Sequence, residues 1–276
     1  MSRENIDRAT VEGFGHEWSR FDQAALSDDE ARAIFEQYFA IFPWDDVGPS
    51  SVGFDMGCGS GRWAQLVAPR VGTLHCVDAS REALAVAASN LKDLPNCRLH
   101  HASVDDSPLE PRSMDFGYSL GVLHHLPDTA AGLRACTELL KSGAPFLVYL
   151  YYAFDNRPLW FRALWRISDV VRRVISRAPF WLRLGVSGVI ATFIYLPLSR
   201  IARLMEKRID VEGFPLSFYR HRSFYTMRTD ALDRFGTRLE RRFRRDEIES
   251  MMRSAGLIDI RFSENAPFWC AEGIKS

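Results

Sequence analysis

The sequence predicts an α/β protein with a doubly wound, mostly parallel sheet of seven strands that ends in an antiparallel C-terminal hairpin. Three observations support this fold class. Apolar runs alternate with helical patterns from Ser51 to Tyr151, as in parallel sheets whose strands are joined by helices. A glycine-rich turn follows the first apolar run, and two short apolar runs lie near the C-terminus. A helical insertion at residues 155–213 interrupts the pattern.

Residues 1–50 are expected to form a helical segment ahead of the sheet. Ser27 followed by Glu30 makes a capping box, the signature of a helix start. Apolar residues then recur at helical spacing as far as Phe42.

The first predicted strand leads into the turn Val52-Gly-Phe-Asp-Met-Gly-Cys-Gly-Ser-Gly-Arg62. Glycine is needed where a chain turns sharply from strand to helix and a ligand lies against bare backbone. Amide N–H groups at such a helix start favour an anionic or hydrogen-bond-accepting group. The spacing is one residue tighter than in dinucleotide binders. The residues assigned to a cofactor here are Asp55, Gly57, Cys58, Gly59 and Gly61.

The second strand, Thr73–Ser80, carries Asp78 near its end, about twenty residues after the first glycine, where a second strand delivers a carboxylate to a ribose diol. A carboxylate can accept hydrogen bonds from both hydroxyls. We assign Asp78 and the adjoining Ala79 to the cofactor. The alternative is that Asp78 merely precedes Ser80, the N-cap of the next helix.

Three further segments complete the parallel part of the pattern. The third strand, Asn96–Ala102, runs into a polar turn that begins at Ser103. The fourth lies within Ser113–Asp128, and the fifth is Ala144–Tyr151.

These motifs resemble those of the class I S-adenosylmethionine-dependent methyltransferases, in particular small-molecule enzymes of the ubiquinone/menaquinone C-methylase type. The glycine turn is similar to the family's motif I. The fourth segment is similar to its pattern fD-x-x-x-x-x-x-v-L-H-H-l-x-D, through Asp115, Leu123, His124, His125 and Asp128. The likeness is good over roughly 51–151, moderate over Phe243–Cys270, and absent between them.

The resemblance implies a Rossmann-like fold and S-adenosylmethionine as cofactor. It implies that Asp55 organises the turn and contacts the cofactor's amino-acid end. At the junction after the third strand, Ser103 begins the adenine site, with Val104 against the ring and Asp105 at its exocyclic amine. Leu120 and Gly121, at the end of the fourth strand, are assigned to the same cofactor.

The resemblance also divides the chain into parts. Residues 51–154 and 214–276 form the cofactor-binding core, and residues 1–50 cover the cofactor site. Trp18 and Phe21 either fold over that site or pack on the sheet. Near the C-terminus, Arg244–Leu257 is the expected helix. Ile258–Ser263 and Ala266–Ala271 are the expected hairpin strands.

The insertion at 155–213 combines apolar and basic residues. Its first helix has an apolar stripe that includes Trp160 and Leu164, with a basic face opposite. From Arg157 to Arg208 there are eleven Lys or Arg and two acids, whereas the chain as a whole is neutral, so a basic lid accompanies an acidic body. Such a lid favours an apolar acceptor with an anionic end.

Something must cover the apolar stripe of the insertion. The alternatives are the rim of the active site, a partner subunit in a homodimer, or an anionic membrane in contact with 157–208. The second apolar stretch, Gly185–Leu196, is expected to stop at Pro197. It would then be too short for a spanning helix, which needs about 20 apolar residues.

Composition bounds the class of protein. The five cysteines are widely spaced, without a C-x-x-C pair or a zinc spacing, and no metal site is expected. Their odd number favours a reducing compartment, and the polar start of the sequence is unlike a signal peptide. We therefore expect a cytoplasmic protein.

The chemistry implied is an in-line displacement at a sulfonium methyl, for which the protein orients the acceptor and, where needed, removes its proton. His124 and His125, at the carboxyl end of the fourth strand, are the candidate bases. Either could instead be a structural residue bonded to a backbone group.

Several acceptor classes are disfavoured. The Asp/Asn-Pro-Pro-aromatic tetrad of nucleic-acid amino-methylases and the Pro-Cys pair of cytosine C5 methylation are both missing, so no nucleic-acid partner is expected. Asp128 alone offers itself for a magnesium site. A small-molecule acceptor remains, at oxygen, nitrogen or carbon. Two other function classes stay open, a non-catalytic S-adenosylmethionine-binding or membrane-peripheral module and a dehydrogenase-like nucleotide binder.

Overall fold

The computed structural model describes residues 5–23, 25–211 and 213–276, and the chain divides into two compact units. The first unit consists of Met1–Asp22, Ala31–Ala153 and Leu239–Ser276. The second consists of Gln23–Glu30 and Phe154–Arg238.

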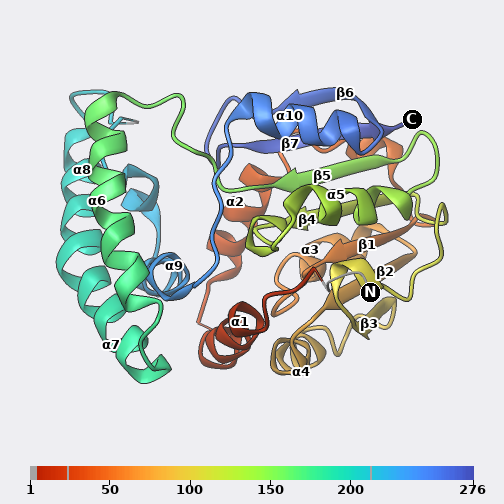
Figure 1. The fold of residues 1–276 in the computed structure, drawn as a ribbon, viewed down its shortest axis with the longest axis horizontal. Helices are drawn as coiled ribbons and strands as arrows, with labels where there is room; N and C mark the ends of the chain where they lie inside the picture. The colour runs from red at the N-terminus through yellow and green to blue at the C-terminus, as the bar shows by residue number, and fades with distance from the viewer. Residues whose placement is uncertain (1–4, 24, 212) are drawn as a thin grey trace. The chain divides into compact units, whose positions relative to one another are not determined.

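The first unit is built on one sheet of seven strands in the order β3-β2-β1-β4-β5-β7-β6 (Figure 1). The strands are β1 (Val52–Met56), β2 (Thr73–Asp78), β3 (Cys97–His101), β4 (Phe116–Leu120), β5 (Pro145–Tyr149), β6 (Leu257–Phe262) and β7 (Cys270–Lys275). The pairs among β1–β5 are parallel, and β7 runs antiparallel to both β5 and β6. The predicted Rossmann-like sheet with its antiparallel end is confirmed.

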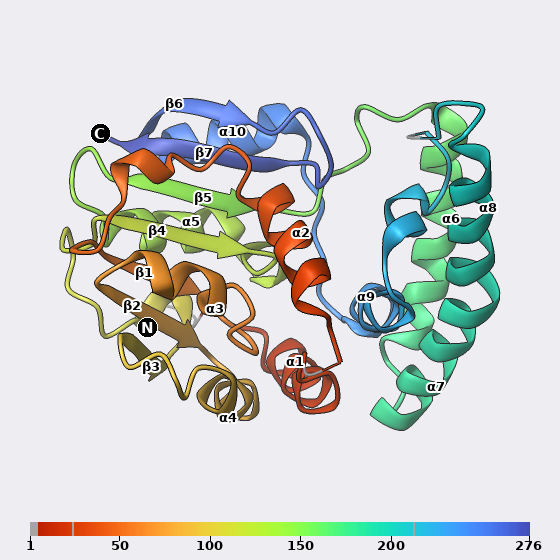
Figure 2. The ribbon, with the colours of Figure 1, turned by 180° about the vertical axis from the view of Figure 1, so that it is seen from behind.

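Helices cover both faces of this sheet. They are α1 (Arg8–Arg20), α2 (Asp28–Tyr38), α3 (Ala64–Val67), α4 (Arg81–Asn90), α5 (Thr129–Glu138) and α10 (Arg245–Ser254), with short 3₁₀ turns η1 (Trp44–Asp46), η2 (Ala68–Arg70), η3 (Val104–Asp106) and η4 (Leu123–His125). Leu133 of α5 and Met252 of α10 join one core cluster, on the face seen in Figure 1. Phe35 of α2 and Val67 of α3 join the other, on the face seen in Figure 2.

The strand order places the candidate site. β1 lies between β2 and β4, so the connections after β1 and β4 leave the sheet toward opposite faces. Open α/β sheets bind ligands at such a switch point, outside the carboxyl ends of the strands. The glycine turn follows β1, and the two histidines follow β4.

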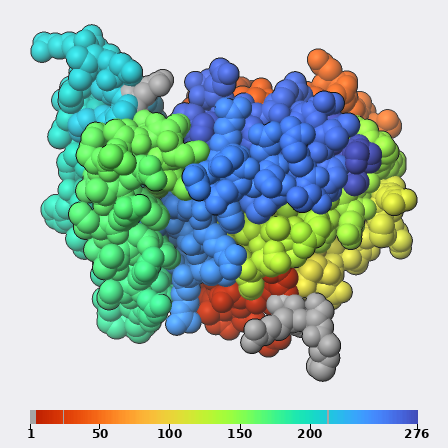
Figure 3. Space-filling view, turned by 45° about the horizontal axis from the view of Figure 1, so that its top comes forward, coloured from red at the N-terminus to blue at the C-terminus, as the bar shows by residue number. Residues whose placement is uncertain are grey.

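The second unit is helical. Its elements are α6 (Leu159–Ile175), α7 (Phe180–Ile190), the π-helical turn η5 (Ala191–Tyr195), α8 (Leu196–Met205), the 3₁₀ turn η6 (Ser217–His221) and α9 (Phe224–Gly236). Tyr195, Met227 and Phe235 belong to its small apolar core. Helix α6 forms an outer surface of this unit (Figure 3). The unit runs past residue 213 to Arg238 because α9 packs on α6, α7 and η5.

The expected break at Pro197 is wrong. Elements α7, η5 and α8 form one continuous helix, Phe180–Met205, of 26 residues. Pro197 lies in the first turn of α8, directly after the π turn. The wider π turn accommodates a residue that lacks an N–H and would otherwise end the helix. By length and composition this helix could cross a membrane, and 22% of its apolar window is buried.

The second hairpin strand begins later than expected. The sequence pattern placed it at Ala266–Ala271, whereas β7 spans Cys270–Lys275. Phe268 and Trp269 are instead packed in aromatic contacts, with ring centroids 5.7 Å from Tyr152 and 6.1 Å from Phe262, respectively. These contacts hold the segment before β7 out of the ladder.

The expected capping box is formed in part. The Glu30 N–H donates to Ser27 Oγ at 3.3 Å. The Glu30 carboxylate, however, accepts hydrogen bonds from the Ser223 N–H at 2.9 Å and the Thr226 hydroxyl at 2.8 Å. Because Ser223 and Thr226 belong to α9 and its N-cap, Glu30 belongs to the second unit.

Candidate active site

The glycine turn has the backbone that its sequence predicts. Gly57, Gly59 and Gly61 have φ angles of 82°, 54° and 77°, which glycine adopts without strain. A Cβ on Gly57 would lie 2.4 Å from the side chain of Val122. One on Gly59 would lie 2.9 Å from the Trp18 indole nitrogen. Both the conformation and the packing therefore exclude larger residues.

Several N–H groups of this turn are used within the fold. The Gly57 and Cys58 N–H groups donate to the Val77 carbonyl, at 2.7 and 3.0 Å. Helix α3 has four residues and gives way to η2 at Ala68. A ligand at this turn can therefore approach the backbone closely, but finds few N–H groups that are free to donate hydrogen bonds to it.

Asp78 holds the turn in place. Its carboxylate accepts hydrogen bonds from the Gly59 N–H and the Ser80 N–H, each at 2.8 Å. Burial raises the pKa of Asp78, against the opposing effect of these two donors. A carboxylate has about four lone-pair sites, so acceptor capacity is left for a diol. Ser80 caps α4, as in the alternative that the sequence left open for Asp78, and the role of Asp78 in a ribose site stays a prediction. At the same strand end, His101 Nε2 donates to the Ala79 carbonyl at 3.0 Å.

Asp55 lies inside the protein. The residue is 1% exposed, and neither carboxylate oxygen has a hydrogen-bond partner among the described residues. Burial raises its pKa to about 8, against the effect of the nearby Tyr118 hydroxyl, while the Asp78 charge raises it further. The protonated form of Asp55 is thus favoured near neutral pH.

The turn after β3 is hydrogen-bonded to Asn5, near the N-terminus. The Asn5 N–H donates to Asp105 Oδ2 at 3.0 Å. Partial burial raises the pKa of Asp105, but hydrogen bonds from the Asn5 N–H, the Ser103 side chain and the Asp105 N–H together lower it below its usual value. Val104 belongs to the core cluster that includes Phe54, and Ser103 precedes η3.

Sequence reasoning missed Asn5. Its side chain makes two reciprocal hydrogen bonds with the backbone of Asp128, the N-cap of α5. Asn5 Nδ2 donates to the Asp128 carbonyl, and the Asp128 N–H donates to Asn5 Oδ1, each at 2.8 Å. Asn5 therefore joins the turns that follow β3 and β4. One polar residue in a polar segment gives no sequence signal of this role.

Helix α1 continues from Asn5 toward the glycine turn. The ring of Trp18 lies against Gly59, with the Arg62 guanidinium 5.7 Å from its centroid. Gly15 permits close packing on α4, because a Cβ there would lie 2.7 Å from Ser80 Oγ. Of the two expected positions for the aromatic segment, Trp18 takes the one on the turn, and Phe21 is buried.

Two different surroundings follow the end of β4: open space at Gly121 and a buried imidazole at His124. Gly121 has a φ of 80°, and a Cβ there would meet nothing within 4 Å. Its neighbour Leu120 is buried. His124 is fully buried, and both of its ring nitrogens lack a hydrogen-bond partner among the described residues. Its ring is stacked on Tyr151, with centroids 3.9 Å apart.

The charge state of His124 follows from this setting. Burial lowers its pKa well below the usual 6.5, and the His125 ring and the Arg242 guanidinium act in the same direction. His124 is therefore neutral at pH 7 and can accept a proton or a hydrogen bond.

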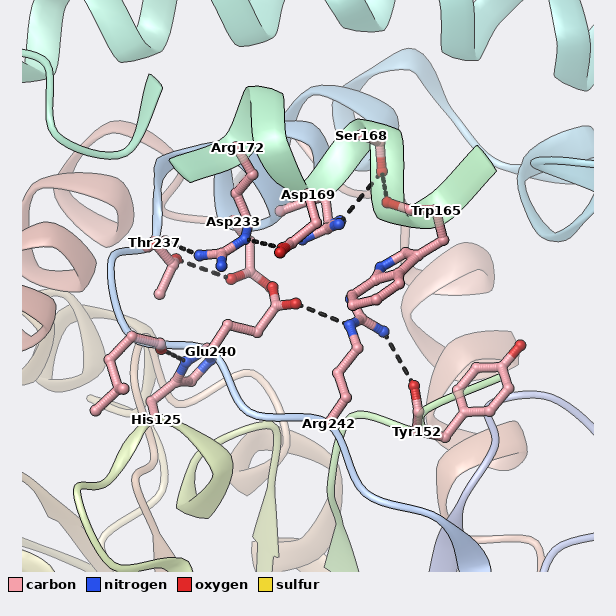
Figure 4. Close-up of polar contacts among 12 residues, drawn as sticks. His125, Tyr152, Trp165, Ser168, Asp169, Arg172, Asp233, Thr237, Glu240 and Arg242 are labelled. Carbon is pink, nitrogen blue, oxygen red and sulfur yellow. Dashed lines mark hydrogen bonds and ion pairs between the residues drawn. The ribbon is translucent and has the colours of Figure 1, made fainter. Parts of the chain in front are cut away.

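His125 has a structural contact. Its Nδ1 donates to the Leu239 carbonyl at 2.6 Å (Figure 4), and its ring meets Phe14 edge-on, with centroids 4.9 Å apart. This is the backbone-bonded arrangement that the sequence left open as an alternative to a catalytic role.

A buried ion pair lies next to the histidines. Arg242 Nε donates to Glu240 at 2.8 Å, and Arg242 Nη1 donates to the Tyr152 carbonyl at 3.3 Å (Figure 4). The same guanidinium lies 5.0 Å from the centroid of the Tyr151 ring. Neither Arg242 nor Tyr151 was predicted. Both lie outside the motifs that the sequence shows: Arg242 is in the loop before α10, and Tyr151 follows the end of β5.

The predicted residues therefore gather at one edge of the sheet, where parallel β1, β2, β3 and β4 all end. The Gly59 N–H is bonded directly to the Asp78 carboxylate, and Gly57 lies against Val122, which follows the predicted Gly121. Among the residues that the structure describes, no group of His, Cys, Asp and Glu could hold a metal ion.

Comparison with known proteins identifies part of the chain. Residues 54–148 match a family described as a methyltransferase domain. Phosphoethanolamine N-methyltransferase 2 of Caenorhabditis elegans is 29% identical over 109 residues, which are 38% of this chain and 25% of that protein. Ubiquinone biosynthesis O-methyltransferase of Pseudomonas putida is 27% identical over 148 residues, 50% of this chain and 61% of that one. The match thus spans only part of each relative.

A solved structure has the same fold over more of the chain. The S-adenosylmethionine-dependent methyltransferase SibL, in its apo form, superposes with a TM-score of 0.53. The alignment covers 94% of this chain and 61% of SibL, at 14% sequence identity.

Proposed function

We propose that this chain, whose residues 54–148 form a class I S-adenosylmethionine-dependent methyltransferase domain, is an enzyme that methylates a small molecule. The observation that carries the proposal is the contact between the glycine turn and the acid of the next strand. Three positive-φ glycines follow β1, and the Asp78 carboxylate is bonded to the middle one. Such a pairing suits a nucleoside whose ribose lies against bare backbone.

The residues present fit S-adenosylmethionine. Asp78 retains acceptor capacity for a ribose diol, and Asp105 can accept from an exocyclic amine. Gly121 leaves open space at the end of β4. When bound, the cofactor supplies the methyl group on its sulfonium. The protein's own contribution is to hold the acceptor in line and to exclude water.

His124 is proposed as the group that takes the acceptor's proton. It is neutral, buried and free to accept a hydrogen bond at either ring nitrogen, depending on its tautomer. Proton transfer from an acceptor hydroxyl or amine would go to that nitrogen as the new bond to the methyl group forms. Because burial disfavours the imidazolium, the proton is held only transiently.

The proposed acceptor is an apolar molecule with an anionic end. The excess of basic residues in 157–208 supports the anionic end. The names of the two relatives include phosphoethanolamine, which carries a phosphate, and ubiquinone biosynthesis. A cytoplasmic protein is part of the proposal, since all five cysteines are free thiols.

Two measurements test the function. Isothermal titration calorimetry with S-adenosylmethionine and with NAD should show binding of the first and not the second. Release of S-adenosylhomocysteine should then be followed with a panel of hydroxylated, amino and quinol-type acceptors. Binding of NAD alone would contradict the cofactor. Tight binding without turnover of any acceptor would favour a non-catalytic module.

A further inference from the structure

The amphipathic helix α6 buries its polar side and exposes its apolar side, the reverse of a helix in an ordinary soluble domain. Soluble helices bury their apolar stripe and expose their polar side. In α6 the polar residues Asp169 and Arg172 are buried, each only 6% exposed. The apolar residues are exposed, among them Ile167 at 66% and Val174 at 72%.

Specific bonds fix this orientation. Arg172 Nε donates to Asp169 Oδ1 at 2.7 Å, and Arg172 Nη1 donates to the Thr237 carbonyl at 2.9 Å (Figure 4). Burial would raise the pKa of Asp169, but the Arg172 hydrogen bond and the nearby arginines lower it, so the pair remains charged. Rotating α6 to hide its apolar side would break the contacts that this pair makes outside the helix, namely the Arg172 bond to the Thr237 carbonyl and the Arg234–Asp169 ion pair.

The long helix Phe180–Met205 has the same arrangement. Its inner side is lined by small or polar residues, Ser187, Ala191, Ser199 and Ala202. On that side Ala191 and Tyr195 pack with Met227 of α9. Large apolar side chains are exposed along the rest of the helix, namely Trp181, Leu182, Val189, Phe193, Ile194, Ile201 and Leu204.

The exposure is confined to this part of the chain. Among the described residues, every exposed large hydrophobic side chain except Phe224 and Ile258 lies within residues 159–209. An apolar surface of this extent marks a protein or membrane interaction site. We call the exposed apolar residues of α6 and of Phe180–Met205 the apolar face.

Positive charge accompanies the apolar face. Arg166 and Arg173 are exposed on α6, Arg177 is exposed in the turn directly after it, and Arg203 is exposed on α8. An amphipathic helix with large apolar residues on one side and Lys or Arg beside them lies in the interface of an anionic bilayer. We propose that the second unit docks on an anionic membrane surface through the apolar face, with its helices lying in the plane of the interface.

A spanning arrangement is disfavoured by the inner side of the long helix. Arg183 donates to the Gly236 carbonyl and Arg200 to the Arg220 carbonyl, so charged groups at both ends of the helix are bonded to the main chain of its neighbours. A spanning helix would carry α9, with its Arg and Asp residues, into the hydrocarbon. In-plane docking keeps this inner side away from lipid.

A second copy of the chain fits the apolar face less well. In a twofold interface each patch meets its own equivalent. That arrangement would bring the exposed arginines of α6 close to those of the partner, and such like-charge contacts oppose association. Anionic lipid satisfies the same arginines, which favours it as the occupant.

Vesicle co-sedimentation of the full chain tests the proposal. The protein should pellet with vesicles of phosphatidylcholine and phosphatidylglycerol, and much less with phosphatidylcholine alone. Ile167→Glu with Phe193→Glu should lower the partition coefficient roughly tenfold or more, the factor expected when large side chains leave an apolar phase. Ile258→Glu, an exposed apolar residue of the first unit, is the matched control and should pellet like the parent chain.

The charge contribution is measured separately. Replacing Arg166, Arg177 and Arg203 by Gln should weaken binding by roughly fivefold per residue at low salt. The three exposed residues Lys92, Arg98 and Arg134 of the first unit, also changed to Gln, give a control of equal charge. At about 1 M salt, where the Debye length is roughly 3 Å, the arginine variant and the parent should converge.

Other results would overturn the proposal. Failure of the parent chain to pellet would do so, as would pelleting that is indifferent to the Glu substitutions. Retention in the membrane after alkaline carbonate extraction would indicate spanning instead. Light scattering that shows a dimer lost in the Ile167→Glu, Phe193→Glu variant, without vesicle binding, would assign the apolar face to a second copy.

Discussion

At the scale of single residues, the candidate site contains two buried ionisable groups that the fold keeps uncharged. Asp55 and His124 both lack hydrogen-bond partners among the described residues. Burial raises the pKa of the acid and lowers that of the base, so both favour their neutral forms near pH 7. Buried ionisable groups without hydrogen-bond partners lower the stability of a fold. Their presence in a native protein therefore marks them as candidates for a function.

The first prediction concerns His124. His124→Gln should lower kcat by roughly 10²–10⁴-fold, the usual contribution of a general base, with little change in S-adenosylmethionine affinity. The low-pH limb of the rate profile should lie below 6.5 in the parent and vanish in the variant. His125→Gln is the comparison, because His125 is bonded to the Leu239 carbonyl and should affect stability more than the pH profile.

An unchanged pH profile in His124→Gln would return this residue to a structural role. An acceptor that arrives as a carbanion or thiolate needs no base. For such an acceptor the rate loss should be small while the affinity for the acceptor changes.

The second prediction concerns Asp55 and pH. The folded pKa of about 8 lies above the usual 3.8, so the folded chain holds a proton that the unfolded chain releases between these values. The free energy of unfolding should therefore fall as pH rises from about 4 to about 8. Asp55→Asn, of nearly the same shape, should remove this part of the pH dependence and stabilise the cofactor-free protein at about pH 8.

Urea denaturation at several pH values measures this effect. The same variant should bind S-adenosylmethionine more weakly if Asp55 organises the turn for the cofactor. A variant whose stability curve runs parallel to that of the parent would show that Asp55 is solvated or paired.

The third prediction concerns Asp78. Asp78→Ala should weaken S-adenosylmethionine binding by about 1.5–3 kcal/mol, the range for hydrogen bonds to a charged group. Part of this loss comes from the turn, because the Gly59 N–H loses its acceptor. Asp106→Ala, at an exposed position after β3, is the calorimetric control. Equal affinities in the two variants would remove Asp78 from the cofactor site.

At the scale of elements, local patterns predicted the sheet well and the long-range contacts poorly. The glycine turn could be predicted because backbone conformation restricts residue type directly. The continuation of the helix through Pro197 could not, because the π turn that permits it has no signature in residue types. The position of β7 was missed because Phe268 and Trp269 look like strand residues and are used for packing.

Helix α6 also shows that local patterns do not predict long-range contacts. Its stripe was read correctly as apolar, but periodicity gives only the two faces and not which one is buried. The burial of Asp169 with Arg172 decides that, and it depends on the Thr237 carbonyl, far along the chain. Likewise, the role of Asn5 depends on two turns that lie 100 and 123 residues away along the chain.

The fourth prediction concerns the N-terminal segment as an element. Asn5→Ala removes two hydrogen bonds to Asp128, each worth about 0.5–1.5 kcal/mol net. Local opening of α1 should become easier by about 1–3 kcal/mol, so amide exchange in α1 should speed up while the central strands stay protected. Glu12→Ala, an exposed change on the same helix, should leave exchange unaltered. Uniform acceleration across the sheet would mean that Asn5 supports the whole fold and not this segment.

At the scale of the whole molecule, the proposed cofactor residues and the apolar, basic insertion lie in different units of the chain. The sheet, both of its core clusters and the predicted cofactor residues lie in the first unit. The second unit has its own small core and its own buried ion pair. The family match, residues 54–148, falls entirely within the first unit. Recognition of the acceptor is therefore expected to depend on the part of the chain that the family does not share.

The last prediction tests that division. Ala153 and Leu239 border the excursion into the second unit, and near them the Ala153 N–H donates to the Phe243 carbonyl at 2.8 Å. Replacing residues 154–238 by a short Gly/Ser linker should therefore leave the sheet and its two core clusters able to form. We expect calorimetric affinity for S-adenosylmethionine to stay within about 1 kcal/mol of the parent, since Asp55, Asp78 and Asp105 are all retained. Methyl transfer should be lost, and vesicle binding with it, because the apolar face is removed. If cofactor binding also disappears while circular dichroism reports a folded sheet, the second unit contributes to the cofactor site itself. Retained methyl transfer would show instead that the acceptor is held by the first unit alone.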